Sequence, residues 1–132
     1  MKPELQNQLF QKYPKIFQDR NKSPQETCMC WGLEIGDGWY WLIDMLCYQL
    51  QWDIDKNNEP QIVASQVKEK FGGLRFYTNG STEKQEAQIS LAETMSYHIC
   101  FECGSTKKVS QTERGWIVTL CKDCMEKYLN DK

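Results

Sequence analysis

The chain has 132 residues, with 18 acidic against 16 basic residues and a net charge of −2. Its length suits one domain, and 40% hydrophobic residues, including five Trp, provide enough apolar surface for a folded core, which excludes a disordered chain. The slightly acidic balance disfavours a broad electrostatic surface for nucleic acid.

The first helix is expected between two prolines. Pro3 suits the first turn of a helix, and Pro14 stops the helical pattern. Between them, apolar residues recur at four-residue steps, namely Leu5, Leu9 and Tyr13. The polar loop that follows is expected to return to the core at Cys28, Cys30 and Trp31.

A second helix is expected from the motif GDGW to about Gln51, with Asp37 as its capping residue. One side has the spacing of a core stripe, formed by Trp39, Leu42, Ile43, Leu46 and Leu50. Another side gathers Trp41, Asp44, Tyr48 and Trp52. We favour a partly buried second side, because large aromatic residues often cover a core. A partner surface is the alternative, since Trp and Tyr beside an acid are typical of binding hot spots.

A β-hairpin and a third helix are expected next. Two β-prone runs, 61–69 and 74–78, flank Gly72 and Gly73, which permit the positive φ angles of a tight turn. Strict alternation places Ile62, Ala64, Gln66 and Lys68 on one side of the first run and Val63, Ser65 and Val67 on the other. The third helix, capped by Ser81 or Thr82, leads directly into Cys100. Its inward stripe is Ile89, Ala92, Met95 and Ile99.

The strongest pattern is two C-x-x-C pairs separated by 17 residues, namely Cys100, Cys103, Cys121 and Cys124. Two chelating pairs of thiolates suit tetrahedral zinc, with Zn–S bonds of about 2.3 Å. A hairpin turning near ERG is expected between the pairs, with residues 116–120 as its second strand. A helix beginning at the second pair should then direct Met125, Tyr128 and Leu129 inward. This order is typical of a treble-clef finger, and a three-stranded zinc ribbon is the alternative.

The ligand set predicts a structural role. Four cysteines fill the tetrahedron, whereas a catalytic zinc keeps one position open for water or substrate, so we expect no enzyme. His98 is the only histidine and is expected at the surface or a helix end, without a metal or catalytic role. The remaining cysteines are expected to be buried free thiols: Cys28, Cys30 and Cys47. A second metal site completed by His98 or Asp37 is the alternative.

The expected fold is α+β, with amino-terminal helices, a hairpin-based sheet and a carboxy-terminal treble-clef-like zinc finger. We expect one domain over residues 1–132, with the finger as a subdomain over 98–130. The start of the chain lacks a signal-peptide pattern, and the apolar cluster around Asp44 is too short to span a membrane. Because C-x-x-C pairs suit a reducing compartment, we expect a cytoplasmic protein without a membrane partner.

Several motifs together resemble a known family. GDGW, QVKEKFGGLRFY, CFECG and TLCKDC follow one another between about Tyr13 and Cys124. In this order they are similar to a family of small uncharacterised proteins encoded by bacteriophages and prophages. The resemblance implies the cytoplasm of a bacterial host and supports the four zinc ligands, without implying an activity. Relatives often have a cysteine where this chain has Ile35, so an amino-terminal metal site is disfavoured.

Two classes of function are compatible with these patterns. The first is a non-catalytic phage accessory protein that inhibits or redirects a host protein, for example one of a defence system. The second is binding of nucleic acid or a nucleotide, with Tyr77 or Trp116 as stacking platforms. The candidate partner-binding residues are Trp41, Asp44, Tyr48, Lys68, Lys70, Arg75, Lys107, Lys108 and Arg114. The aromatic side of the second helix is equally compatible with a homodimer.

Overall fold

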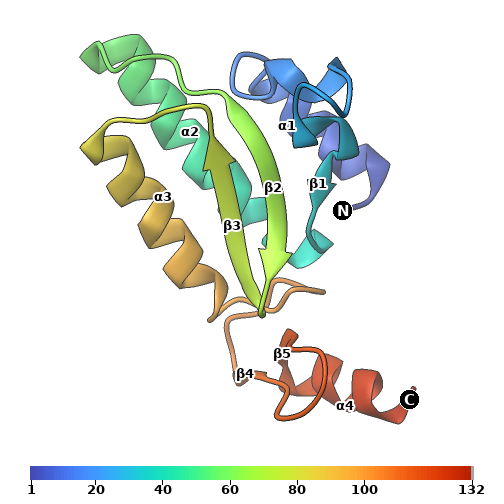
Figure 1. Cartoon of the computed structure of the whole chain (residues 1–132). Coiled ribbons are helices and arrows are strands. Elements are labelled where there is room, and N and C mark those ends of the chain that lie inside the picture. Colours follow the sequence, from blue (N-terminus) through green and yellow to red (C-terminus); the bar gives the residue numbers. More distant parts are fainter. Residues whose placement is uncertain (132) are drawn as a thin grey trace.

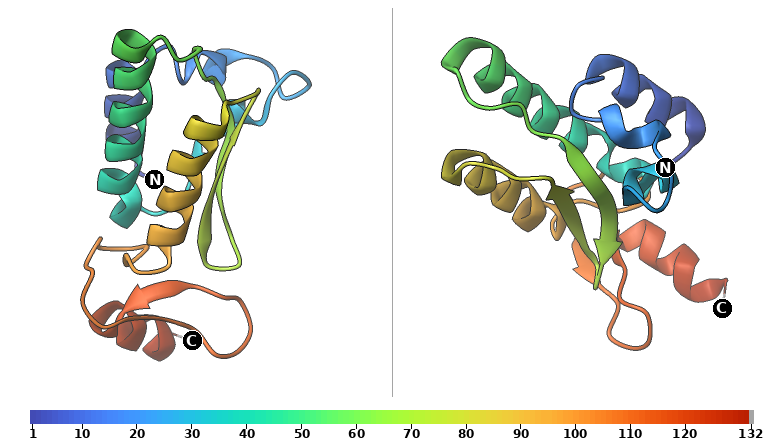
Figure 2. Two further views of the ribbon diagram at one scale, coloured as in Figure 1. Left: turned by 90° about the vertical axis from the view of Figure 1, so that its left-hand side faces the viewer. Right: turned by 45° about the horizontal axis from the view of Figure 1, so that its top comes forward.

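The computed structural model describes residues 1–131 and has an α+β fold, as expected (Figure 1). The helices are α1 (Pro3–Lys12), α2 (Tyr40–Asn57), α3 (Glu83–Ser96) and α4 (Lys122–Asn130). The strands are β1 (Leu33–Glu34), β2 (Ala64–Lys70), β3 (Gly73–Thr78), β4 (Val109–Gln111) and β5 (Thr119–Cys121). β1, β2 and β3 form one sheet in that order, and β4 pairs with β5 in a second one. The second sheet and α4 lie beyond the tip of the β2–β3 hairpin (Figures 1 and 2).

The second helix differs from expectation at both ends. A short 3-10 turn, Asp37–Trp39, precedes α2, and the helix continues past Gln51 to Asn57. Asp37 makes no capping bond to α2, so that expectation is wrong. Its Oδ1 instead accepts a hydrogen bond of 2.8 Å from the backbone amide of Lys2, at the start of α1. The expected core stripe of α2 is confirmed, since all five of its side chains are buried.

The loop between α1 and α2 reaches the core by a different route from the expected one. Cys28 and Trp31 are exposed, whereas Met29, Leu33 and Ile35 are buried. Leu33 lies in β1, which pairs in parallel with β2 and was not predicted. Two residues are too few to show a strand pattern in the sequence, because neither alternation nor length identifies them.

The predicted hairpin is confirmed, with one correction to its faces. Phe71 and Gly72 form the turn with φ angles of 54° and 85°. A register shift between Ala64 and Gln66 interrupts the pairing of β2 with β3. Such a bulge inserts an extra residue and reverses the sides of the strand. Ala64 and Val67 therefore both face the core, contrary to strict alternation.

Helix α3 covers the outer edge of β3. Of the two expected caps, Thr82 is the one observed, and it forms a capping box with Gln85. Near its end, Ser96 Oγ accepts a hydrogen bond of 2.9 Å from the amide of Leu74. Glu93 Oε2 accepts another of 2.9 Å from the amide of Phe76. Side chains of α3 thus satisfy amides that an edge strand would otherwise leave unpaired.

Among the described residues, the buried apolar side chains form a large cluster and a small one. The large cluster joins α1, α2, α3 and the first sheet, with Trp39, Phe17 and Leu9 among its fully buried members. The small cluster consists of Cys100, Leu120 and Cys121, and partly buried Phe101 packs against both clusters. None of the helices within residues 1–131 combines the length and apolar composition needed to cross a bilayer.

Candidate metal centre

The four predicted cysteine ligands lie together. Their Sγ atoms are all within 4.8 Å of one another, and the sulfurs of Cys103 and Cys121 are 3.7 Å apart. Sulfurs on a regular tetrahedron with bonds of about 2.3 Å would be about 3.8 Å apart. The group is therefore arranged to hold a metal ion, as the spacing in the sequence predicted.

Two short structural units supply these ligands. Cys100 and Cys103 lie in a turn after α3, in which the amide of Gly104 donates to the carbonyl oxygen of Cys100 over 3.0 Å. Cys121 ends β5, and Cys124 lies in the first turn of α4. The observed order of the Cys100–Cys103 turn, called the knuckle below, then a hairpin and a helix agrees with the sequence prediction. The second strand of this hairpin is Thr119–Cys121 instead of the expected 116–120. Leu129 is the exception, because its side chain is exposed while Met125 and Tyr128 pack against the small cluster.

The electrostatics of the group favour a cation. Burial raises the pKa of Cys100, but backbone amides of Cys121, Cys103 and Glu102 outweigh it and lower the pKa to about 7. The pKa of Cys124 is raised by burial and then by the neighbouring thiols. Four adjacent thiolates repel one another, and a bound cation removes this penalty. The donor set therefore fits a metal that prefers sulfur.

The GDGW motif is the docking site of the knuckle. A Cβ at Gly36 would lie 2.1 Å from the carbonyl oxygen of Phe101, and one at Gly38 would lie equally close to that of Cys100. The amide of Gly38 donates to the Phe101 carbonyl over 2.9 Å. Trp39 Nε1 donates to the carbonyl oxygen of Ile99 over 2.9 Å. The rings of Trp39 and Phe101 pack edge-to-face, with their centroids 4.9 Å apart. Only glycine permits this close backbone approach.

The region that carries the four cysteines, residues 98–130, is called the finger below. It also contacts the turn of the β2–β3 hairpin. Thr119 Oγ1 donates a hydrogen bond of 2.6 Å to the carbonyl of Gly72. A Cβ at Gly72 would lie 2.9 Å from a methyl group of Ile117. The backbone carbonyl of Thr119 also accepts from the amide of Phe101 over 2.9 Å. The metal group is thus linked to both α2 and the β2–β3 turn through short contacts.

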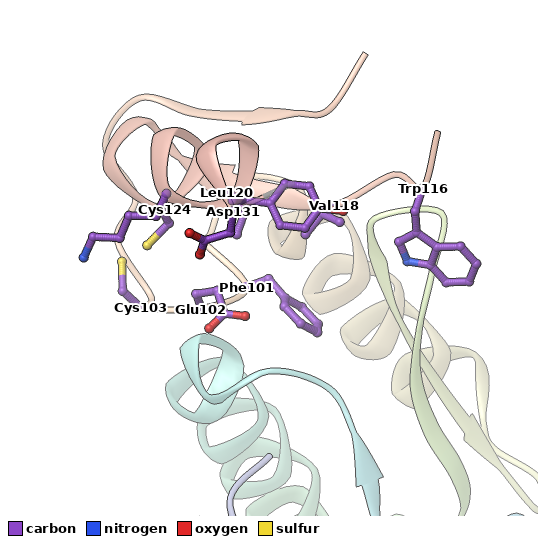
Figure 3. Close-up of a pocket in the computed structure, with 10 residues that line it drawn as sticks. Phe101, Glu102, Cys103, Trp116, Val118, Leu120, Cys124 and Asp131 are labelled. Atoms are coloured by element: carbon purple, nitrogen blue, oxygen red, sulfur yellow. The ribbon is translucent and has the colours of Figure 1, made fainter. Parts of the chain in front are cut away.

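A groove of about 620 Å³ opens beside the ligands, between the knuckle, β5 and α4 (Figure 3). Cys103 and Cys124 form part of its wall, and most of the other lining side chains are apolar or aromatic. Glu102 and Asp131 add carboxylates. The groove gives a metal ion a path from solvent to the sulfurs.

The other cysteines and the histidine do not join this group. Cys47 is buried, as expected, and burial raises its thiol pKa well above the ordinary value. The same expectation is wrong for exposed Cys28 and only partly met by half-buried Cys30. Within residues 1–131, the four-cysteine group is the one cluster with three or more metal-ligating side chains. His98 is exposed after α3, as the sequence indicated, and Asp37 is engaged with Lys2.

The second side of α2 is exposed, so the expectation that it is partly buried is wrong for its aromatic residues. Trp41 is 57% exposed and Tyr48 is 54% exposed. We call Trp41, Met45, Tyr48 and Trp52 the α2 stripe, because these exposed residues recur at steps of four, three and four. Asp44 lies beside the stripe but points to α1, where Tyr13 Oη donates to it over 2.6 Å and Lys12 Nζ over 3.0 Å. Asp44 therefore anchors α1.

The predicted basic residues fall on the β2–β3 hairpin and on the region between the two cysteine pairs. Lys68 and Arg75 are opposite one another on β2 and β3, and Lys70 lies two residues further along β2. Arg75 Nη2 donates to Tyr97 Oη over 3.2 Å, and this bond raises the pKa of the guanidinium, which stays charged. The finger carries exposed Lys107, Lys108 and Arg114. Of the predicted stacking platforms, Tyr77 and Trp116 are both exposed.

Comparisons with known protein families, curated proteins and solved structures found no match for this chain.

Proposed function

We propose that the four cysteines hold a structural Zn²⁺ in a treble-clef finger and that the protein is a non-catalytic binding protein. Soft thiolate ligands in tetrahedral arrangement favour zinc over harder divalent ions. With all four positions taken by sulfur, the ion would have no place for water or substrate. We expect native mass spectrometry to detect one zinc per chain, and two ions per chain would contradict this assignment.

The observation that carries the binding function is the α2 stripe. It lies on the side of α2 opposite the buried stripe, and a helix that is apolar on both sides normally has a partner on each. Exposed Trp and Tyr side chains are enriched among residues that dominate binding energy. The resemblance to phage proteins supports a host protein as the partner, inhibited or redirected by occlusion of its surface in the bacterial cytoplasm.

Affinity capture tests this proposal. The tagged protein is incubated with nuclease-treated host lysate, and the captured host protein is then purified and its dissociation constant measured. We expect the double variant Trp41→Ala, Tyr48→Ala to bind at least about thirtyfold more weakly, since a single hot-spot residue already contributes roughly 2 kcal/mol or more. Trp31→Ala removes a comparably exposed indole outside the stripe and should bind as the unmodified protein does.

Two outcomes would contradict the proposal. In the first, a host protein is captured from untreated lysate but not from nuclease-treated lysate. In the second, the captured protein binds the double variant as tightly as it binds the unmodified protein. A second copy of the chain would also cover the α2 stripe, and sedimentation of the purified protein at increasing concentration separates this occupant from a host protein. A monomer that binds the captured host protein through Trp41 and Tyr48 is the expected result.

A further inference from the structure

A cleft of about 380 Å³ separates the tip of the β2–β3 hairpin from the loop that precedes β5. Residues 68–71 line one wall and residues 115–117 the other. Each wall carries an exposed ring: Phe71 is 68% exposed and Trp116 is 71% exposed. Figure 3 shows the Trp116 indole beside the hairpin tip. The two rings come from segments more than forty residues apart in the sequence.

The two walls are fixed relative to one another. The hairpin and the loop are joined next to the cleft by the hydrogen bond from Thr119 to Gly72, and Ile117 lies so close to Gly72 that a Cβ there would be 2.9 Å from its methyl group. Phe71 has a φ angle of 54°, a conformation that L residues adopt rarely and that the hairpin turn imposes. The cleft is therefore a preformed feature, in which a flat ligand would lose little free energy to ordering of the protein.

The charge of the cleft is positive. Lys68 and Lys70 line it, and within the described residues neither lysine forms an ion pair. Lys70 Nζ lies 5.7 Å from the ring centre of Phe71. Glu69 also lines the cleft, but its Oε2 accepts a hydrogen bond of 2.8 Å from the amide of Gly72. Arg75 pairs with Lys68 across the hairpin but does not line the cleft.

We propose that this cleft binds a nucleobase that carries a phosphate, with the base stacked on Trp116 or Phe71 and the phosphate near Lys68 and Lys70. Aromatic stacking is tolerant of base identity, and lysines pair with phosphate oxygens. The ligand is a free nucleotide or a unit of a single strand. This inference gives the sequence-based alternative a definite site and does not depend on the α2 stripe.

The test uses the zinc-loaded protein and two probes, a short fluorescein-labelled oligothymidylate followed by anisotropy and the nucleotides AMP and UMP followed by calorimetry. We expect Trp116→Ala to weaken binding roughly tenfold or more, as loss of base stacking does. Lys68→Ala with Lys70→Ala should reduce the slope of log K against log salt by about 1.4 for the oligonucleotide. Trp31→Ala and Lys56→Ala are the matched controls, since both residues are exposed outside the cleft.

The two ligand sources give different results. Nucleotides that bind as tightly as the oligonucleotide indicate a free nucleotide, and binding of the oligonucleotide alone indicates a single strand. Phe71→Ala is a second variant in case Trp116→Ala unfolds, as judged by circular dichroism and zinc content. No binding of either probe at millimolar concentration, or binding unchanged in the folded variants, overturns the inference. The double variant Trp41→Ala, Tyr48→Ala should bind both probes as the unmodified protein does. A negative result for the cleft therefore says nothing about the α2 stripe, and the reverse also holds.

Discussion

At the scale of single residues, Asp53 shows how one buried carboxylate joins α2 to α3. Its Oδ2 accepts from Gln88 Nε2 over 2.7 Å, and its Oδ1 accepts from Asn57 Nδ2 over 2.8 Å. Lys84 Nζ lies 3.4 Å from the same carboxylate. These hydrogen bonds lower the pKa of Asp53 to about 2, and the bond from Gln88 has the largest effect. The charged form is therefore favoured by folding.

The consequence is a dependence of stability on pH. Because the folded pKa lies below the ordinary value of about 3.9, the stabilisation is complete above about pH 5 and is lost as pH falls from there through the folded pKa of about 2. We expect Asp53→Asn to lower the urea midpoint at pH 7 and to differ less from the unmodified protein at pH 2.5. Measurement of unfolding at both pH values tests this, and a difference that does not depend on pH would contradict it.

The cysteines and the glycines differ in how far the sequence predicts them. Cys100 and Cys103, like the second pair, are identified by spacing, because a chelating pair is a local feature. In the sequence, Gly36 and Gly38 are recognisable only as part of the GDGW motif that begins the second helix. Their actual constraint is the backbone at Cys100 and Phe101, more than sixty residues away, and single-sequence patterns do not contain such contacts.

At the scale of elements, helices and the hairpin were predictable because their periodicity is local. β1 and the bulge in β2 were not, since both depend on pairing with distant strands. The exposure of the α2 stripe was also missed. Periodicity indicated two apolar sides of α2, but it did not reveal that α1 contacts α2 at Tyr40 and Asp44 while the α2 stripe stays exposed.

The edge of β3 offers a test at this scale. Ser96→Ala removes the acceptor for the amide of Leu74, and both residues are buried. An unpaired buried amide costs about 1–3 kcal/mol, so the free energy of unfolding should fall by that amount. Ser90→Ala changes an exposed serine of the same helix and should be near neutral. Equal unfolding midpoints for the two variants would show that water or another group replaces Ser96.

At the scale of the whole molecule, the small cluster of the finger is too limited to hold its own fold. Cys100 and Cys121 are themselves two of its three buried members. Binding of zinc to such modules contributes on the order of 10 kcal/mol to folding. The finger in turn packs on Gly38 and Gly72, so its order should extend into the larger body.

Metal removal should therefore affect the segments of the chain to different degrees. We expect a chelator to abolish hydrogen-exchange protection in β4, β5 and α4, and to lower it moderately at the start of α2 and the β2–β3 turn. Protection in the centre of α2, around Leu46, should persist because the large cluster remains. Hydrogen exchange with mass spectrometry, before and after chelation, measures all of these segments. Unchanged protection of the finger would contradict the proposed structural metal.

The glycine contacts at the knuckle also impose an order in time. A ribosome completes α2 and the β2–β3 hairpin well before it reaches Cys124. During this interval the surface around Gly38 and Trp39, on which the knuckle packs, is uncovered. Trp39 Nε1 can donate its hydrogen bond to the carbonyl oxygen of Ile99 only after Ile99 has been synthesised. We therefore expect binding of the proposed metal to be the last step of folding, and chains that lack the metal to have a folded body with an uncovered surface around Gly38.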